Sequence, residues 1–518
     1  MRRLFLLICA FVFASPAHAE WWEARTDHFI VYSESSAEDA KSFTERLERF
    51  DLALRQLQQI ELKPIRSDAQ RLTVFRSGNT DYIGQLAGSP GVAGFYIPRI
   101  TGSVSFTPAK ADLRTGTGSI YRRDKRTDLD PASVLLHEYT HHFMYQHFSA
   151  AYPLWYSEGF AETAATIVMN PDGSFHVGNP PQYRSDALFS GMMRLSIEKM
   201  LTSKEELDFM RYYGSYTYGW LLNHYLSFDP SRKGQLTTYL RLLNQGVDSA
   251  QAARQAFGDL RKLDADVNRY KNSGRLGGAD VRPANYTPPV VTLRKLGPDE
   301  EAIMPIRIRS SAGVNRKKAR DVAAEARGVA ARYPQSLPVQ LALAEAELDA
   351  EQYDAAEAAM NRALALKPNS VNAMLLKSAV YLERGKTDKT KMPMARDWAA
   401  RAYKADPYQP GSLLLNYLTY WYEGTAAPET ALVGLERAFE MAPYDQTARM
   451  VLARQLLAEK KGDLARTILI PLAVRAHESK DTKPLGEVVK LIEQNKVDEA
   501  YKKLVELMKK AEDEAKKD

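Results

Sequence analysis

The first half of the chain mixes short β-branched and aromatic stretches with segments of helical spacing, and helical spacing dominates the second half. His28–Ser33 and Arg71–Ser77 are rich in β-branched and aromatic residues with polar residues on either side, which predicts two strands. Gly91–Pro108 predicts two more short strands around a Pro/Gly turn. Ala37–Ile60 has the spacing of an amphipathic helix, with apolar residues at Phe43, Leu47, Phe50, Leu54 and Leu57. The mixture predicts an α+β domain over residues 20–270.

A further helix is predicted over Asp130–His147. Asp130 is expected to be its N-cap and Pro131 its first helical residue, because proline fits that position without losing a hydrogen bond. The segment that follows the α+β domain, residues 271–315, is dense in glycine and proline and predicts a linker or an extended strap. The alternative is that it supplies the last strand of the first domain.

Residues 316–515 are almost purely helical and repeat a fixed spacing of small residues and prolines. Each repeat places two alanines seven residues apart and a proline five residues later, and an earlier helix ends at Pro334. The three sets are Ala356, Ala363 and Pro368; Ala395, Ala402 and Pro407; and Ala431, Ala438 and Pro443. This pattern resembles tetratricopeptide repeats, in which small residues let paired helices approach closely. The resemblance implies an all-α solenoid that binds a protein partner.

The first nineteen residues predict a signal peptide. Arg2 and Arg3 precede an apolar core at Leu4–Ala14, and Ala17 and Ala19 form the small-residue pattern of a cleavage site. An uncleaved anchor is the alternative, although the apolar run is too short to span a bilayer. No later segment approaches eighteen uninterrupted apolar residues, so no transmembrane segment is expected. We therefore predict an exported, periplasmic protein.

Export narrows the chemistry that the mature chain can perform. The only cysteine, Cys9, lies in the predicted signal peptide, so any metal must be held by histidine or carboxylate side chains. Removing Arg2 and Arg3 lowers the formal net charge from +6 to +4, which is nearly neutral for a chain of this length. This charge argues against nucleic acid as the partner.

The run Leu135–Met144, "LLHEYTHHFM", carries the strongest chemical signal. His137 and His141 stand four residues apart and share one face of the predicted helix, and Glu138 lies between them. Two interpretations are open: a metal site with a general base, or a core helix that contains histidines. His142 falls on a different face and is interpreted as a surface or core residue.

A second motif, "LWYSEGFAETAATI", follows the first. Ser157 is expected to cap a second helix and to place Glu158 in its first turn, where Glu158 can become a third metal ligand. Glu162 lies four residues later on the same face and can accept a hydrogen bond from a ligand histidine. The alternative is that Glu158 is only a carboxylate stabilised by the helix dipole.

Together, "HEYTH" and "WYSEGFAE" resemble the gluzincin metallopeptidases and the broader set of bacterial peptidase-MA-like domains. The resemblance implies a thermolysin-like fold and a Zn2+ ion held by His137, His141 and Glu158, with Glu138 as the general base. "YYGSYTYGWLLNHYL" resembles the family pattern in which a tyrosine before a helix stabilises the oxyanion. Tyr216 is the first choice for that role and Tyr213 the second; an aromatic packing cluster is the alternative.

One departure from the family affects the predicted activity. The zinc aminopeptidases bind the substrate amine with a glutamate in a "G-x-M-E-N" strand, but the corresponding stretch here, residues 91–106, contains no acidic residue. We therefore expect a zinc-dependent endopeptidase acting on a protein or peptide substrate, which an edge strand can pair with in extended form. The alternative is a periplasmic scaffold or chaperone-like protein whose peptidase domain is inactive; a hydrolase of cell-wall peptides is a third possibility.

Overall fold

A computed structural model describes residues 20–90, 92–110, 131–148, 150–184, 188, 195–202, 209–473 and 483–515. The predicted signal peptide, with Cys9, and the predicted N-cap Asp130 lie outside the described residues. Within the described residues, no helix has both the length and the apolar character that a membrane crossing requires.

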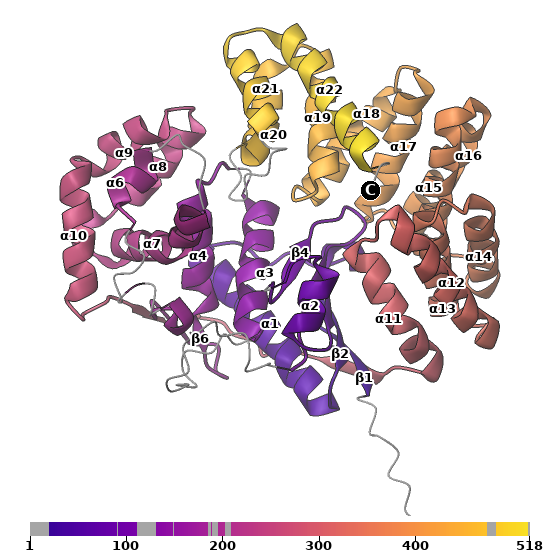
Figure 1. Ribbon diagram of the computed structural model, residues 1–518, viewed down its shortest axis with the longest axis horizontal. Helices are drawn as coiled ribbons and strands as arrows, with labels where there is room; N and C mark the ends of the chain where they lie inside the picture. Colours follow the sequence, from indigo (N-terminus) through magenta and orange to yellow (C-terminus); the bar gives the residue numbers. More distant parts are fainter. Residues whose placement is uncertain are drawn as a thin grey trace, which may run out of the picture.

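A mixed sheet lies at the lower centre of the molecule (Figure 1). Its strands follow the order β4-β5-β3-β2-β1-β9. The central pairs β2 with β3 and β3 with β5 are parallel, and the remaining pairs are antiparallel. The strands are β1 (Trp21–Arg25), β2 (Phe29–Glu34), β3 (Leu72–Arg76), β4 (Phe95–Ile97), β5 (Val104–Thr107) and β9 (Thr292–Lys295). The strands predicted at β2, β3, β4 and β5 are confirmed to within a few residues, whereas no strand was predicted at β1.

Helices cover both faces of this sheet. On one face, α1 (Ala37–Gln58) and α3 (Pro131–His147) bury their apolar residues against β1, β2 and β3. On the other face, α2 (Thr80–Leu86) and α11 (Pro298–Ala312) pack against an aromatic layer. That layer consists of Trp21, Tyr32, Phe75 and Phe106. The helix α3 begins at Pro131 and ends at His147, as predicted, and the layers hold it firmly beside the sheet.

A second group of helices packs beyond α3. It contains α4 (Leu154–Ala165), α6 (Ile197–Thr202), α7 (Phe209–Phe228), α8 (Gln235–Asn244), α9 (Ser249–Phe257) and α10 (Leu260–Asn272). These helices surround a core that includes the fully buried Trp220 and Tyr239. A small sheet, β6 (Val168–Met169), β7 (Phe175–Val177) and β8 (Ala279–Val281), lies next to them.

Residues 271–315 contain regular structure at three places. The strands β8 and β9 and the helix α11 all fall in this segment. β9 pairs with β1, and α11 buries Met304 and Ile308 against the main sheet while Ile303 and Ile306 face the helical repeats. The segment therefore contributes to the cores of both parts of the molecule.

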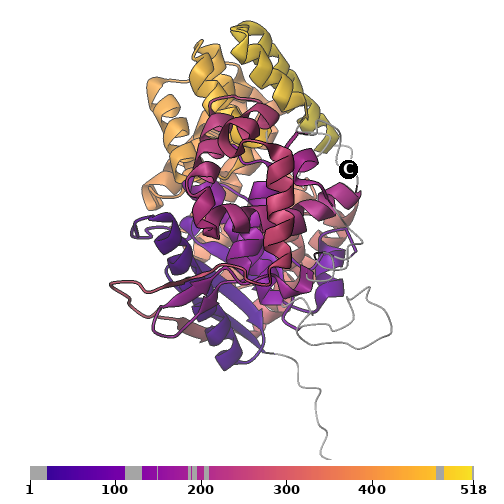
Figure 2. The same cartoon turned by 90° about the vertical axis from the view of Figure 1, so that its left-hand side faces the viewer.

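The rest of the chain forms antiparallel helix pairs that stack into an arch over the sheet (Figures 1 and 2). Its helices are α12 (Arg316–Arg332), α13 (Leu337–Asp349), α14 (Tyr353–Leu366), α15 (Val371–Thr387), α16 (Met392–Ala405), α17 (Pro410–Glu423), α18 (Glu429–Met441), α19 (Gln446–Ala458), α20 (Gly462–Ala473), α21 (Lys483–Glu493) and α22 (Val497–Ala515). An α+β part followed by helical repeats is therefore the layout of the chain, as predicted.

The repeated alanines and prolines have clear structural roles. All six alanines of the repeat pattern are fully buried, so the paired helices can lie close together. The helices α12, α14, α16 and α18 each end two residues before a proline, and the next helix has its N-cap two residues after it. These N-caps are Ser336, Ser370, Gln409 and Asp445, and each accepts a hydrogen bond from the first turn of its helix.

Candidate metal centre

The helix α3 presents two different faces. Leu135, Leu136 and Phe143 are almost fully buried against the sheet, because their spacing places them on one side of the helix. His137 and His141 lie on the face toward α4, and both imidazoles are buried. Glu138, between them in sequence, remains half-buried.

Three side chains from α3 and α4 converge on one point. The Nε2 atom of His137 lies 3.1 Å from Oε2 of Glu158 and 3.2 Å from Nε2 of His141. The third distance, from Nε2 of His141 to the same oxygen of Glu158, is 3.5 Å. Glu158 is fully buried, so these donor atoms form a compact triangle enclosed by protein. The structure thus brings together the three residues that the sequence predicts as metal ligands.

A close helix crossing holds Glu158 in this position. Gly159 of α4 lies against Gly219 of α7, so near that a Cβ atom built on Gly159 would stand 2.3 Å from the carbonyl oxygen of Gly219. A Cβ atom on Gly219 would meet the carbonyl oxygen of Trp155 at the same distance. Any larger residue at either position would separate the two helices, and with them Glu158 and Tyr216.

The prediction for Ser157 is wrong, and its actual position has a different use. The helix α4 starts at Leu154 after the N-cap Pro153, so Ser157 and Glu158 lie in its second turn. Leu154 can already begin the helix because Pro153 has an extended backbone conformation that supports a helix start. The Ser157 hydroxyl instead lies 3.2 Å from Nδ1 of His141, where it fixes the orientation of that imidazole.

Glu162 lies close to His137, the other histidine of the triangle. Its Oε1 atom lies 3.8 Å from Nδ1 of His137, which is an ion-pair distance but longer than a hydrogen bond. Two residues of a downstream turn hold the buried Glu162 carboxylate. The guanidinium of Arg184 donates to Oε1 at 2.8 and 3.1 Å, and the Tyr183 hydroxyl donates to Oε2.

Sequence reasoning missed Arg184 and Tyr183. They lie in the short turn Gln182–Arg184, which has no spacing relation to either motif. The only signal in the sequence is a cation and a phenol about twenty residues after two glutamates, and such combinations are common. Contacts between residues this far apart depend on the fold of the intervening loop.

Tyr216 lies beside the histidine pair, in the middle of α7. Its ring stacks on that of His137 with centroids 5.8 Å apart, and the Arg184 guanidinium lies 4.9 Å from the Tyr216 ring centre. The expectation that this tyrosine precedes a helix is wrong, because α7 begins seven residues earlier at Phe209. Tyr213, the second choice, lies in the same helix. Tyr218 belongs to the buried core around Trp220.

The electrostatics of the triangle favour a bound cation. Burial of the His137 imidazole lowers its pKa, but the hydrogen bond with Glu158 and the charge of Glu162 outweigh burial and raise the pKa of His137 to about 9. Burial acts to raise the pKa of Glu158, and the two histidines overcome it and hold that pKa well below the usual range. The buried carboxylates thus create a negative potential at the triangle, which a protonated imidazole or a metal cation can balance.

Replacing Arg184 with Gln is expected to lower the affinity of the triangle for a divalent metal ion by roughly 10- to 100-fold, the usual cost of losing a residue that supports a metal ligand. Without the guanidinium, the buried Glu162 carboxylate attracts a proton to His137, and this proton competes with the metal. Competition with a chromogenic chelator measures the affinity. Arg282→Gln is the matched control, because Arg282 is exposed and pairs only at 3.9 Å with the exposed Asp172. Equal affinities for both variants would contradict a role for Arg184.

A second buried group of potential ligands lies between β2 and α1, and it already contains a positive charge. Nδ1 of His28 lies 2.6 Å from Glu48 and 3.3 Å from Asp51. Asp51 also accepts from Arg55 at 2.5 Å and from the Tyr139 hydroxyl at 2.6 Å. Because Arg55 already supplies the positive charge, this group is interpreted as an ionic network that joins α1 to α3.

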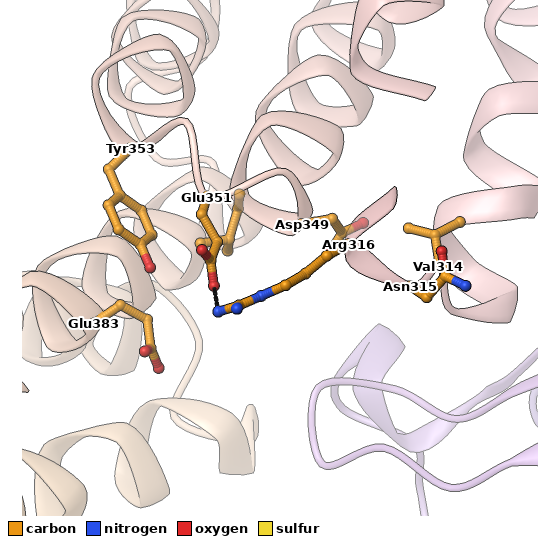
Figure 3. Close-up of a pocket in the computed structure, with 8 residues that line it drawn as sticks. Val314, Asn315, Arg316, Asp349, Glu351, Tyr353 and Glu383 are labelled. Atoms are coloured by element: carbon orange, nitrogen blue, oxygen red, sulfur yellow. Dashed lines mark hydrogen bonds and ion pairs between the residues drawn. The ribbon is translucent and has the colours of Figure 1, made fainter. Parts of the chain in front are cut away.

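A cavity of about 320 Å³ lies in the repeat part, away from the metal triangle (Figure 3). Arg316 extends across it to pair with Glu351 near Tyr353 and Glu383, and Asp349 lines it close to the backbone end of Arg316. Burial, and then the nearby Glu345 carboxylate, raise the pKa of Asp349 to about 7.

Asp349→Asn is expected to stabilise the protein at alkaline pH. A carboxyl group whose pKa is higher in the folded state than in the unfolded state destabilises folding as the pH rises from about 4, and the full penalty is reached above about 7. An amide removes that penalty, so the variant should gain on the order of 2 kcal/mol at pH 8 and much less at pH 4.5. Urea unfolding at both pH values measures the difference, with Asp321→Asn on the exposed surface of α12 as the control. A gain that does not depend on pH would contradict the buried charge as its cause.

Comparison with known proteins does not assign the chain to a family. No protein-family model matches the chain, and no curated protein sequence matches it.

Proposed function

We propose that the chain is a zinc-dependent peptidase of the gluzincin type. The observation that carries the proposal is the triangle of His137, His141 and Glu158, whose donor atoms lie 3.1 to 3.5 Å apart. Ligands placed tetrahedrally about 2.0–2.1 Å from zinc stand roughly 3.4 Å from one another. The three side chains therefore fit a zinc ion with little rearrangement.

The chemistry of the donor set supports zinc over calcium and magnesium. Two imidazoles and one carboxylate form the ligand set of catalytic zinc sites, whereas calcium and magnesium prefer oxygen ligands. The partners of the ligands support the same choice: Ser157 orients His141, and Glu162 with Arg184 lies behind His137.

Each residue then has a role in peptide hydrolysis. A bound zinc ion supplies Lewis-acid activation of water and of the scissile carbonyl. Glu138 takes the proton released by the attacking water and delivers it to the leaving amine, a role that its half-buried position next to His137 permits. Tyr216, stacked on His137, donates a hydrogen bond from its phenol to the tetrahedral oxygen.

The sheet provides a place for an extended substrate. β4 is at one edge of the sheet as the described strands are ordered, and Gly94 just before it lies so close to Val134 of α3 that a Cβ atom there would stand 2.8 Å from that side chain. A peptide pairing with β4 would thus run beside the active-site helix. The absence of acidic residues between positions 91 and 106 leaves no group in this stretch to bind a substrate amine, so we propose an endopeptidase.

The remaining parts of the proposal rest on sequence patterns. The first nineteen residues favour export to the periplasm. The alanine and proline spacing, together with the paired helices from α12 onward, supports tetratricopeptide repeats that bind a protein or peptide.

Metal content and a peptide screen test this function against that of a scaffold. Elemental analysis of the purified full chain should give about one zinc per chain, as one triangle of ligands implies, and a mixed peptide library should be cleaved at internal bonds. A protein that holds zinc but cleaves nothing would support a scaffold or chaperone-like role. A protein that excludes zinc would overturn the assignment of the metal site.

A further inference from the structure

His142 follows the metal motif directly but takes no part in the ligand triangle. It is buried on the opposite side of α3, where its Nδ1 atom lies 2.7 Å from the Tyr96 hydroxyl of the edge strand β4. Its ring also lies 4.9 Å, between centroids, from the ring of Tyr444. Tyr444 belongs to the turn between α18 and α19, which is part of the helical repeats. His142 is therefore in contact with both the edge strand and the repeat part.

Asp445, the residue after Tyr444, makes a second connection to the same strand. One of its carboxylate oxygens caps α19 by accepting from the backbone of Ala448 at 2.7 Å. The other accepts from the backbone N–H of Ile100 at 2.8 Å. Ile100 lies in the turn that joins β4 to β5, so one buried carboxylate holds a repeat helix and the edge hairpin together.

The equivalent turn of the preceding repeat, between α16 and α17, contacts the same hairpin. The Gln409 side chain donates to the carbonyl oxygen of Thr101 at 3.2 Å. Gly411 packs so tightly that a Cβ atom there would stand 2.8 Å from the Thr101 side chain. Two successive repeat turns thus fix the end of the β4–β5 hairpin from residues more than 300 positions away.

Burial affects the two acidic groups that the repeats bring to this junction. Burial raises the pKa of Tyr444 far above the ordinary tyrosine value. Burial also raises the pKa of Asp445, against the backbone hydrogen bonds that its carboxylate accepts.

We propose that Tyr444 and Asp445 are positioning residues for substrate binding. They hold β4 at a fixed distance from the helix that carries His137, Glu138 and His141, so the repeat part holds in place the edge strand with which an extended peptide pairs. This inference rests on the proposed peptidase function and deepens it, because it assigns the repeats a structural share in the substrate site in addition to partner binding.

Asp445→Asn in the full-length chain tests the proposal. An asparagine has a single acceptor oxygen, which the capping bond to Ala448 retains, so the variant loses mainly the bond from Ile100. The KM for an extended peptide should rise roughly three- to tenfold, in line with the loss of one hydrogen bond, while kcat and zinc content stay within about twofold. Asp388→Asn is the matched control, because Asp388 caps the turn Lys389–Lys391 with one exposed carboxylate oxygen that an asparagine retains.

Amide hydrogen exchange gives a readout that does not need activity. In Asp445→Asn, the amides of β4 and the following turn should exchange roughly twofold faster or more, while those of the ligand-bearing part of α3 remain protected. Tyr444→Leu, which removes the ring from His142, should change KM and exchange in the same direction and serves if Asp445→Asn does not fold. Unchanged KM and exchange, or equal changes in Asp388→Asn, would overturn the positioning role. An inactive wild-type protein with faster exchange in Asp445→Asn would overturn the peptidase function and leave the structural coupling standing.

Discussion

Glu138→Gln is expected to lower kcat for peptide hydrolysis by roughly 10²- to 10⁴-fold, the range usually lost with a general base. Glutamine has almost the same shape as glutamate, but its amide cannot take up the proton of the attacking water. The three ligand side chains remain in place, so the zinc content should equal that of the wild-type protein. Steady-state hydrolysis of an internally quenched peptide, with zinc measured on the same samples, checks both expectations.

A matched control separates the role of Glu138 from a general loss of charge. Glu38 is exposed in the first turn of α1, on the part of the molecule that covers the sheet, and Glu38→Gln should retain full activity. If Glu138→Gln kept more than about a tenth of the wild-type kcat, a different base would have to act.

The second large effect is expected at Glu158. Glu158→Gln removes the only anionic ligand of the triangle. The imidazoles of His137 and His141, which lie 3.1 and 3.5 Å from Glu158, then lose their negatively charged partner. Zinc affinity should fall by more than the roughly 100-fold upper value for residues that only support a ligand. Competition with a chelator, followed by zinc analysis after dialysis, measures the loss.

Glu162→Gln provides an internal comparison on the same helix. Glu162 is equally buried but lies 3.8 Å from Nδ1 of His137, behind the ligand and outside the triangle. Its replacement should weaken zinc binding less than that of Glu158. A larger loss of zinc affinity in Glu162→Gln than in Glu158→Gln would contradict the assignment of Glu158 as the ligand.

Local sequence patterns predicted much of the fold because they reflect local physics. The helix over α1 follows from the spacing of Phe43, Leu47, Phe50 and Leu54, all of which are buried against the sheet. The start of α3 follows from Pro131, and alternate repeat boundaries follow from the prolines two residues after α12, α14, α16 and α18. In each case, the residues that determine the element lie within it or next to it.

What the sequence did not predict depends on contacts between distant segments. β1 pairs with β9 across about 270 residues, and no local pattern specifies that partner. Ser157 was expected to be a cap, but the preceding proline starts α4 one turn earlier and leaves Ser157 to contact His141. Arg184 and Tyr183 reach Glu162 only through the fold of the intervening loop. The convergence of His137 and His141 was predictable because they stand four residues apart on one helix.

Removal and restoration of zinc tests the proposed chemistry most directly. Hydrolysis of casein by the full-length protein should stop after treatment with a strong chelator and return when about one equivalent of zinc per chain is added. The Glu138→Gln protein should bind the same equivalent and stay inactive. Hydrolysis that continues after the zinc has been removed would contradict a zinc peptidase.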